Sequence, residues 1–212
     1  MAQKTIHEAF AKFFESPRRD TLRDLLKDQS GELKSCDFKE TWPEHGPLSK
    51  HFLGLANTGG GCLVVGVKEK DDNTLESVGL AELKDKADIY NGIKYYLPES
   101  ILSILEVGDY AFDASEYPNL VGKRFQVAFV SPNIVDIPFV ARKNGTGIRE
   151  GAIYIRREGL TEEAGYEQVQ SMLEQRIVNA LPSTQARHLL EHLEELKVLY
   201  EPVARRVSEP AP

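Results

Sequence analysis

The stretch that decides the fold is ELKSCDFKETWPEHGPLSKHFLGLANTGGGCLVVGV, residues Glu32–Val67. Its first part, Leu33–Glu40, alternates in the manner of a strand, in which successive side chains point to opposite faces. Asp37 and Lys39 therefore share one face, and Glu32 comes just before the strand. The pattern predicts acidic and basic side chains gathered at one edge of a sheet.

The second part of this stretch predicts a helix, a glycine turn and a buried strand. Leu48–Thr58 carries apolar residues at three- and four-residue spacing, which is typical of a helix. Cys62–Val67 is a short apolar run that suits a strand buried on both faces. The segment Asn57–Gly61 between them reads as a helix stop or as a phosphate cradle. It follows a helix and lacks Gly-Lys-Ser/Thr, which favours the helix stop.

The remaining chain alternates between helical and strand-like patterns. We predict a helical hairpin over residues 1–30, an α+β domain over 31–178, a C-terminal helix over 183–204 and a disordered tail over 205–212. Within the domain, the expected strands are Leu75–Val78, Leu102–Val107, Gly122–Val130, Phe139–Arg142 and Ala152–Arg157, and the expected helices are Ala81–Leu97 and Thr161–Ile177. The fold class is α+β, with a mixed or antiparallel sheet flanked by helices.

The C-terminal helix carries a short heptad seam. Its apolar positions are Ala186, Leu189, Leu193, Leu196, Tyr200 and Val203. Such a seam favours a homo-oligomer, but a helix that packs back on its own domain has the same pattern. Both interpretations stay open on the sequence.

Composition indicates an ordinary soluble globular chain. It has 212 residues with 41% hydrophobic and 28% charged residues, and no apolar run of membrane-spanning length. Two cysteines without a secretory signal favour a cytoplasmic protein with no membrane partner. The net charge of -7 disfavours nucleic-acid binding over the whole surface and leaves room for a local basic groove.

Several motifs together resemble a known family. They are Asp37-Phe38-Lys39 at a strand end, Ala56-Asn57-Thr58-Gly59-Gly60-Gly61 at a helix end, Val65-Gly66-Val67, and the later run Ala152–Ala164. In this order and separation, over about Leu22–Ile177, the chain resembles the Schlafen-type AlbA-like domain. The resemblance implies a Schlafen-core-like fold and a nucleic-acid-binding role.

The acidic residues raise the possibility of a metal site. In Schlafen-type nucleases a trio of acids holds a divalent ion. Glu32 and Asp37 match the spacing of two of them, Glu69 or Asp71 would be the third, and Lys39 lies beside them as a catalytic cation. Carboxylates are the ligands that Mg²⁺ or Mn²⁺ prefers. Lys68 stands where the family commonly has the third acid. The alternative is a set of solvated strand-end charges paired with lysines.

A basic run stands against the overall acidic charge. Its candidate nucleic-acid-binding residues are Arg142, Lys143, Arg149, Tyr154, Arg156 and Arg157. Arginines on a hairpin grip phosphates, and a tyrosine between them stacks on a base. The alternative is ordinary surface charge.

These observations lead to two functional hypotheses. The first is a nucleic-acid-binding domain that, as the resemblance implies, cuts tRNA-like or other structured RNA with a divalent metal, in phage defence or a stress response. The second is a non-catalytic regulator that binds single-stranded or duplex DNA or RNA and oligomerises through its last helix. A protein-interacting subunit with a decayed site is a third possibility.

Overall fold

The structure is a computed structural model. It describes residues 9, 12–13, 15–27, 35–70, 74–114, 118–157, 159–177 and 179. Glu32, the predicted seam over 183–204 and the predicted tail lie outside the described residues, as does most of the predicted N-terminal hairpin's first helix.

Eight strands and several helices make up this part of the chain. The strands are β1 (Cys36–Lys39), β2 (Gly61–Val65), β3 (Val67–Glu69), β4 (Leu75–Ser77), β5 (Leu105–Phe112), β6 (Lys123–Val130), β7 (Tyr154–Arg157) and β8 (Leu160–Glu163). The helices are α2 (Arg19–Lys27), α3 (His45–Asn57), α4 (Lys86–Ile93), α5 (Glu99–Leu102) and the 3-10 turn η1 (Pro118–Leu120). Residues 166–177 are also helical.

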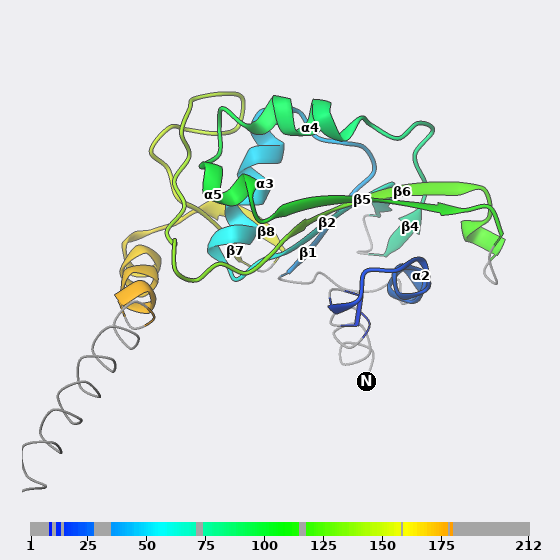
Figure 1. Cartoon of the computed structure of the whole chain (residues 1–212), viewed down its shortest axis with the longest axis horizontal. Coiled ribbons are helices and arrows are strands. Elements are labelled where there is room, and N and C mark those ends of the chain that lie inside the picture. The colour runs from blue at the N-terminus through cyan, green and yellow to red at the C-terminus, as the bar shows by residue number, and fades with distance from the viewer. Residues whose placement is uncertain are drawn as a thin grey trace, which may run out of the picture.

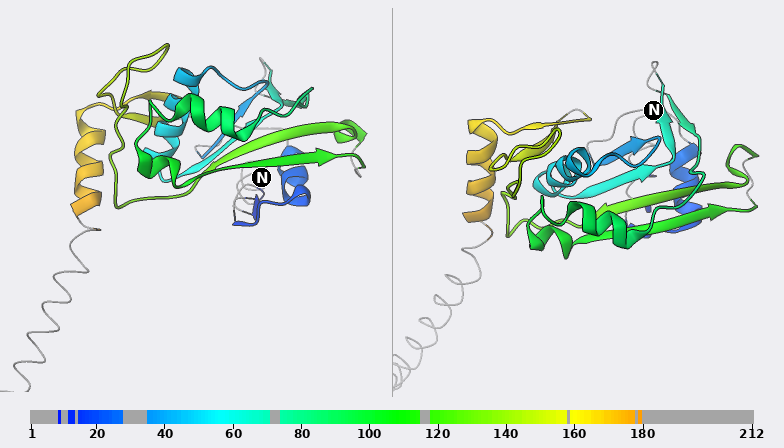
Figure 2. Two further views of the ribbon diagram at one scale, coloured as in Figure 1. Left: turned by 45° about the horizontal axis from the view of Figure 1, so that its top comes forward. Right: turned by 90° about the horizontal axis from the view of Figure 1, so that it is seen from above.

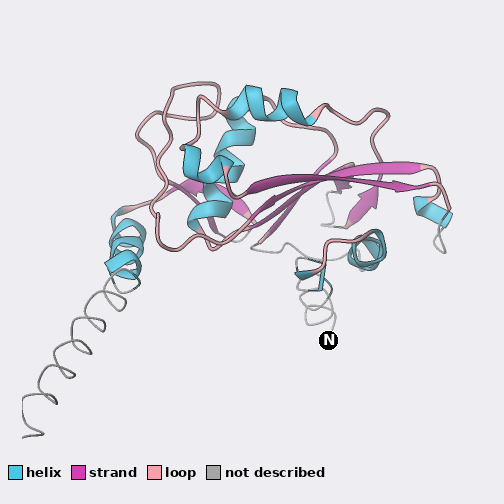
Figure 3. Ribbon diagram, viewed as in Figure 1, coloured by secondary structure: helices cyan, strands magenta, loops and turns pink. Residues whose placement is uncertain are grey.

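The central sheet is mixed, with strand order β1-β2-β6-β5. β1 and β2 are parallel, because α3 carries the chain back between them, and the other pairs are antiparallel. Two small hairpins, β3–β4 and β7–β8, stand beside this sheet. Figures 1 and 3 show the strands crossing the middle of the molecule with helices around them. The predicted α+β class is confirmed.

The two faces of the sheet bury separate cores. Side chains of α3 and α4, such as Phe52 and Ile89, pack with Leu63 and Val65 on one face. On the other face, Cys62 and Val64 of β2 pack against α2. Figure 1 shows α3 and α4 on one side of the sheet and α2 on the other. Since β2 is buried on both faces, its continuous apolar sequence is explained.

Four predicted elements need correction. The strand predicted over Leu102–Val107 is β5, which begins only at Leu105 and runs to Phe112, because Leu102 belongs to α5. Leu160–Glu163 is strand β8 rather than the start of the predicted helix Thr161–Ile177, because it pairs with β7 across the turn at Gly159. The helix predicted over Ala81–Leu97 is confined to α4, since Asp85 caps it by accepting a hydrogen bond from the Ala87 amide. The segment predicted as the strand Phe139–Arg142 has an irregular backbone.

The helix over residues 166–177 lies at one end of the molecule, as Figure 2 shows in orange. Met172 is buried, whereas Tyr166, Leu173 and Ile177 are exposed. No helix within the described ranges is both long and apolar enough to cross a bilayer.

The glycine turn after α3 ends the helix and lets β2 approach β1. The amides of Thr58 and Gly60 donate to the Leu55 carbonyl. Gly61 has φ of 147°, and a Cβ there would lie 2.1 Å from the Ser35 carbonyl oxygen. That oxygen accepts a hydrogen bond from the Cys62 amide. The turn therefore ends α3 and lets the backbone at Gly61 cross the backbone at Ser35 in close contact.

We expect Gly61→Ala to destabilise the fold by about 2–3 kcal/mol or more, because it adds a backbone clash to a strained φ. Gly59→Ala is the matched control, since Gly59 also has a positive φ of 94° but nothing lies near its Cβ position. Urea unfolding followed by the fluorescence of the single tryptophan measures both. Equal losses for the two variants would contradict the close crossing.

Candidate functional site

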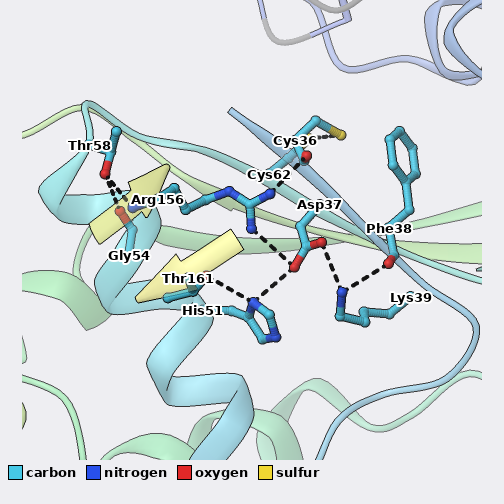
Figure 4. Close-up of polar contacts among 10 residues, drawn as sticks. All are labelled: Cys36, Asp37, Phe38, Lys39, His51, Gly54, Thr58, Cys62, Arg156 and Thr161. Atoms are coloured by element: carbon cyan, nitrogen blue, oxygen red, sulfur yellow. Dashed lines mark hydrogen bonds and ion pairs between the residues drawn. The ribbon is translucent and has the colours of Figure 1, made fainter. Parts of the chain in front are cut away.

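A buried carboxylate lies at the centre of the charged cluster that the sequence singled out. Asp37 of β1 is only 7% exposed. Its Oδ1 accepts from Lys39 Nζ at 2.9 Å, and its Oδ2 lies 2.9 Å from His51 Nδ1 and 3.2 Å from Arg156 Nη1. Figure 4 shows the three basic side chains converging on this one carboxylate. Asp37 therefore has basic partners at both oxygens.

The partners of Asp37 come from elements that are far apart in the sequence. His51 belongs to α3, and Arg156 belongs to β7. Arg156 also donates from Nη2 to the Cys36 carbonyl at 3.3 Å, so it binds β1 through backbone and side chain together. The cluster joins the sheet edge, the crossover helix and the β7–β8 hairpin.

The end of α3 holds the β7–β8 hairpin in place. Asn57 donates through Nδ2 to the carbonyls of Phe139 and Tyr154, and its Oδ1 accepts from the Phe139 amide. Thr58 Oγ1 accepts from the Arg156 amide. Both side chains belong to the Ala-Asn-Thr-Gly-Gly-Gly run, so this motif positions Arg156 as well as stopping the helix.

A close contact between α3 and the hairpin completes this packing. A Cβ on Gly54 would lie 2.7 Å from Thr161 Cγ2 and 3.3 Å from Arg156 Cγ. Only a residue without a side chain lets the helix lie so near the hairpin. The distance from α3 to Arg156 thus depends on glycine at position 54.

The electrostatics of the cluster favour the ionised form of Asp37. Burial alone raises the pKa of this carboxyl, because it disfavours the charge. The hydrogen bond from His51 and the charges of Arg156, His51 and Lys39 outweigh burial and hold the pKa of Asp37 well below its ordinary value. Asp37 is therefore an anion at every pH near neutrality.

Two cysteine thiols lie beneath this cluster. Cys36 and Cys62 are opposite each other on β1 and β2, with their sulfur atoms 3.4 Å apart. Both thiols are free and buried. Burial, together with the neighbouring Cys62, raises the pKa of Cys36 well above its ordinary value, so this thiol stays protonated.

The arrangement around His51 does not form a nucleophilic triad. Thr161 Oγ1 lies 3.3 Å from His51 Nδ1, the same nitrogen that contacts Asp37. A relay needs the carboxylate on one ring nitrogen and the hydroxyl on the other. Thr161 and Asp37 therefore share one nitrogen, and the geometry supports positioning of the ring rather than activation of the hydroxyl.

The predicted metal site is not assembled by the described residues. Asp37 already contacts basic groups at both oxygens, and Glu69 is an exposed residue of β3. Within the described ranges, no three His, Cys, Asp or Glu side chains are grouped so that they could hold a metal ion. The Asp37 environment does not fit a hard cation, and the role of Glu32 stays a prediction.

The structure divides the predicted nucleic-acid-binding residues into three groups. Tyr154 and Arg156 are each 4% exposed, which corrects their expected place on an open surface. The Tyr154 hydroxyl accepts from the Arg149 amide. They are buried because the hairpin packs its inner face on α3.

The other four predicted residues are exposed. Arg149 and Arg157 form ion pairs with Glu163 and Glu162 on the neighbouring strand β8. Lys143 lies instead over two aromatic rings, with Nζ 5.7 Å from the Tyr95 centroid and 5.8 Å from that of Tyr96. Arg142 is next to it in the chain.

Sequence reasoning missed the residues around Lys143. Lys94 Nζ lies 5.2 Å from the Tyr95 ring, and Tyr95 is 62% exposed. The signal was present as Lys94-Tyr95-Tyr96, in which a cation precedes two aromatic residues. It was interpreted as the end of a helix. His51 was also missed, because a single histidine on an amphipathic helix gives no pattern.

Comparisons with known proteins identify no family for this chain. No family model matches it, and no curated protein matches it. Among solved structures, it is similar to the DIP2311 protein from Corynebacterium diphtheriae, with 17% sequence identity and a TM-score of 0.41. The similarity covers 62% of this chain and 22% of that one, so it spans about a fifth of the DIP2311 chain. The Schlafen-type resemblance stays a prediction.

We expect Asp37→Asn to destabilise the protein by about 3–5 kcal/mol, because it leaves the buried Arg156 guanidinium without its counter-charge. Urea unfolding measures this. Glu69→Gln, on an exposed strand, is the matched control and should change stability by less than about 0.5 kcal/mol. A loss of under about 1 kcal/mol for Asp37→Asn would show that the pair is worth no more than a surface ion pair.

The depressed pKa of Asp37 also predicts acid sensitivity. Its stabilising contribution is complete above the unfolded-state pKa of about 3.9 and is lost as the pH falls towards the lower folded value. Stability should therefore drop below about pH 4 more steeply in the natural protein than in Asp37→Asn. Urea midpoints measured from pH 6 to 2 test this, and parallel curves would contradict it.

Proposed function

We propose that the protein binds single-stranded nucleic acid through a surface group of tyrosines and cations, without cutting it. We call this group the tyrosine platform and define it as Lys94, Tyr95, Tyr96, Arg142 and Lys143. The observation that supports the proposal is the exposed Tyr95 ring with two lysine ammonium groups near it, at 5.2 and 5.7 Å from the ring centroid.

The chemistry of the platform suits a single strand. An exposed aromatic ring stacks on an unpaired base, and cations beside it contact the flanking phosphates. A duplex offers no exposed base face to such a ring.

Two chain segments hold the platform together. Tyr95 and Tyr96 follow α4, whereas Arg142 and Lys143 come from the loop before the turn at Gly145. The Arg142 amide donates to the Tyr96 carbonyl at 2.9 Å, which ties the segments. A local basic surface of this kind is compatible with a net charge of -7 over the whole chain.

The surroundings of Asp37 support binding rather than hydrolysis. Metal-dependent cleavage of a phosphodiester needs carboxylates that are available to the ion. Asp37 is instead engaged by Lys39, His51 and Arg156. We therefore favour the non-catalytic module over the endoribonuclease, and we leave open whether the strand is RNA or DNA.

We expect Tyr95→Ala to weaken binding of a labelled single-stranded oligonucleotide by roughly 5- to 150-fold, the equivalent of one lost stacking interaction. Fluorescence anisotropy at fixed salt measures this. Tyr166→Ala is the control, because Tyr166 is 74% exposed on another helix. Equal effects of the two variants, or no binding by the natural protein, would contradict the proposal.

We also expect Lys143→Ala to lower the slope of log affinity against log salt by about 0.7, the value for one phosphate contact with a single strand. An unchanged slope would remove Lys143 from the interface. In the same samples, addition of Mg²⁺ or Mn²⁺ should leave the oligonucleotide at full length on a denaturing gel. Cleavage that disappears in Asp37→Ala would restore the nuclease hypothesis.

A further inference from the structure

A pocket of about 440 Å³ lies beside the tyrosine platform. Its lining includes Trp42, Glu44, His45, Lys84, Tyr96 and Thr146. These residues come from the loop before α3 and its first residue, the segment before α4, the chain after α4 and the turn after Gly145. The volume falls within the range of about 300–1,000 Å³ that small-molecule sites occupy. The cavity is therefore large enough for a small planar ligand.

Hydrogen bonds to one buried amide keep two walls of the pocket in place. Gln126 of β6 is fully buried, and its Oε1 accepts from Trp42 Nε1 at 2.7 Å and from the Lys84 amide at 2.9 Å. Its Nε2 donates to the Lys84 carbonyl and to Asp109 Oδ1, each at 2.9 Å. The indole and the backbone at Lys84 are thus fixed relative to the sheet before any ligand arrives.

Glycines bring the remaining walls into close contact. A Cβ on Gly92 would lie 2.2 Å from His45 Nε2, and one on Gly145 would lie 2.7 Å from the Tyr96 ring. The His45 and Tyr96 rings therefore pack directly on backbone.

The chemistry of the walls indicates which kind of ligand fits. Trp42, His45 and Tyr96 offer aromatic surface to a planar ring. The Glu44 carboxylate accepts hydrogen bonds from N–H groups and repels a phosphate, whereas Lys84 attracts one. A nucleobase that carries N–H donors, with its phosphate directed towards Lys84, meets all of these conditions.

We propose that this pocket receives one unpaired nucleobase of the strand that the tyrosine platform binds. The inference rests on the proposed function and adds to it a site for a single base. Tyr96 connects the two, because it lines the pocket and its ring lies 5.8 Å from Lys143 Nζ. A strand that stacks on Tyr95 has the pocket next to it, and only an unpaired base is free to leave the strand and enter.

Trp42 is the single tryptophan of the chain, so its fluorescence reports on the pocket. The experiment uses the full chain and a mixed-sequence single-stranded RNA, with anisotropy for strand binding and Trp42 emission for the pocket. A second titration uses the free nucleotides AMP and GMP. We expect quenching by the strand and by the nucleotides.

Thr146→Phe fills the pocket from an exposed turn, and Asn119→Phe is the control because Asn119 does not line it. We expect Thr146→Phe to abolish quenching by RNA, to weaken nucleotide binding by roughly tenfold or more, and to preserve strand binding by anisotropy. Asn119→Phe should behave like the natural protein. This pattern supports the pocket.

The outcomes separate the two proposals. If the strand binds by anisotropy while Trp42 emission stays constant, or if quenching survives in Thr146→Phe, the pocket proposal is overturned and the platform stands. If the strand fails to bind, the platform is overturned, and so is the pocket as the site of a base from that strand, even where AMP or GMP quenches Trp42. If neither binds, both are overturned.

Discussion

The contact between Asp37 and Arg156 is the constraint on which the rest of the structure depends. It places a carboxylate and a guanidinium in the interior, where either charge alone is strongly disfavoured. Both groups therefore need the surrounding elements in their observed positions. Because Arg156 also binds the Cys36 carbonyl, the pair attaches the β7–β8 hairpin to the edge strand of the sheet. One interaction thus joins parts of the chain that are more than a hundred residues apart.

The helix α3 connects this interior cluster to the proposed binding surface. Its later residues, His51 and Asn57, hold Asp37 and the hairpin, whereas its first residues line the pocket. The part of α3 that holds the charged cluster is therefore separate from the end of α3 that lines the proposed binding pocket. This division explains how acidic and basic residues near β1 serve the fold, while exposed lysines and tyrosines elsewhere are available to a ligand.

Much of the fold was predictable from the sequence, because apolar periodicity is strong in α3, β2 and β6. The shared face of Asp37 and Lys39 followed from strand alternation, and the two do contact each other. The burial of Arg156 was not predictable, because an arginine in a basic run is expected on the surface. Only the contact with Asp37 explains why it is buried. Strand β8 was missed because a threonine followed by two glutamates is also the usual start of a helix. The pocket is formed by four segments that are distant in the sequence, and no local sequence pattern predicts such a site.

The paired thiols of Cys36 and Cys62 have a consequence for how the molecule can be studied. Their side chains lie in the core on the α2 face of the sheet, so a reagent reaches them only when this packing opens. Since the pKa of Cys36 is raised, its thiol is also slow to react while it stays enclosed. The rate of alkylation of these two sulfur atoms therefore measures how often this buried core opens. No label has to be introduced, since these are the chain's two cysteines.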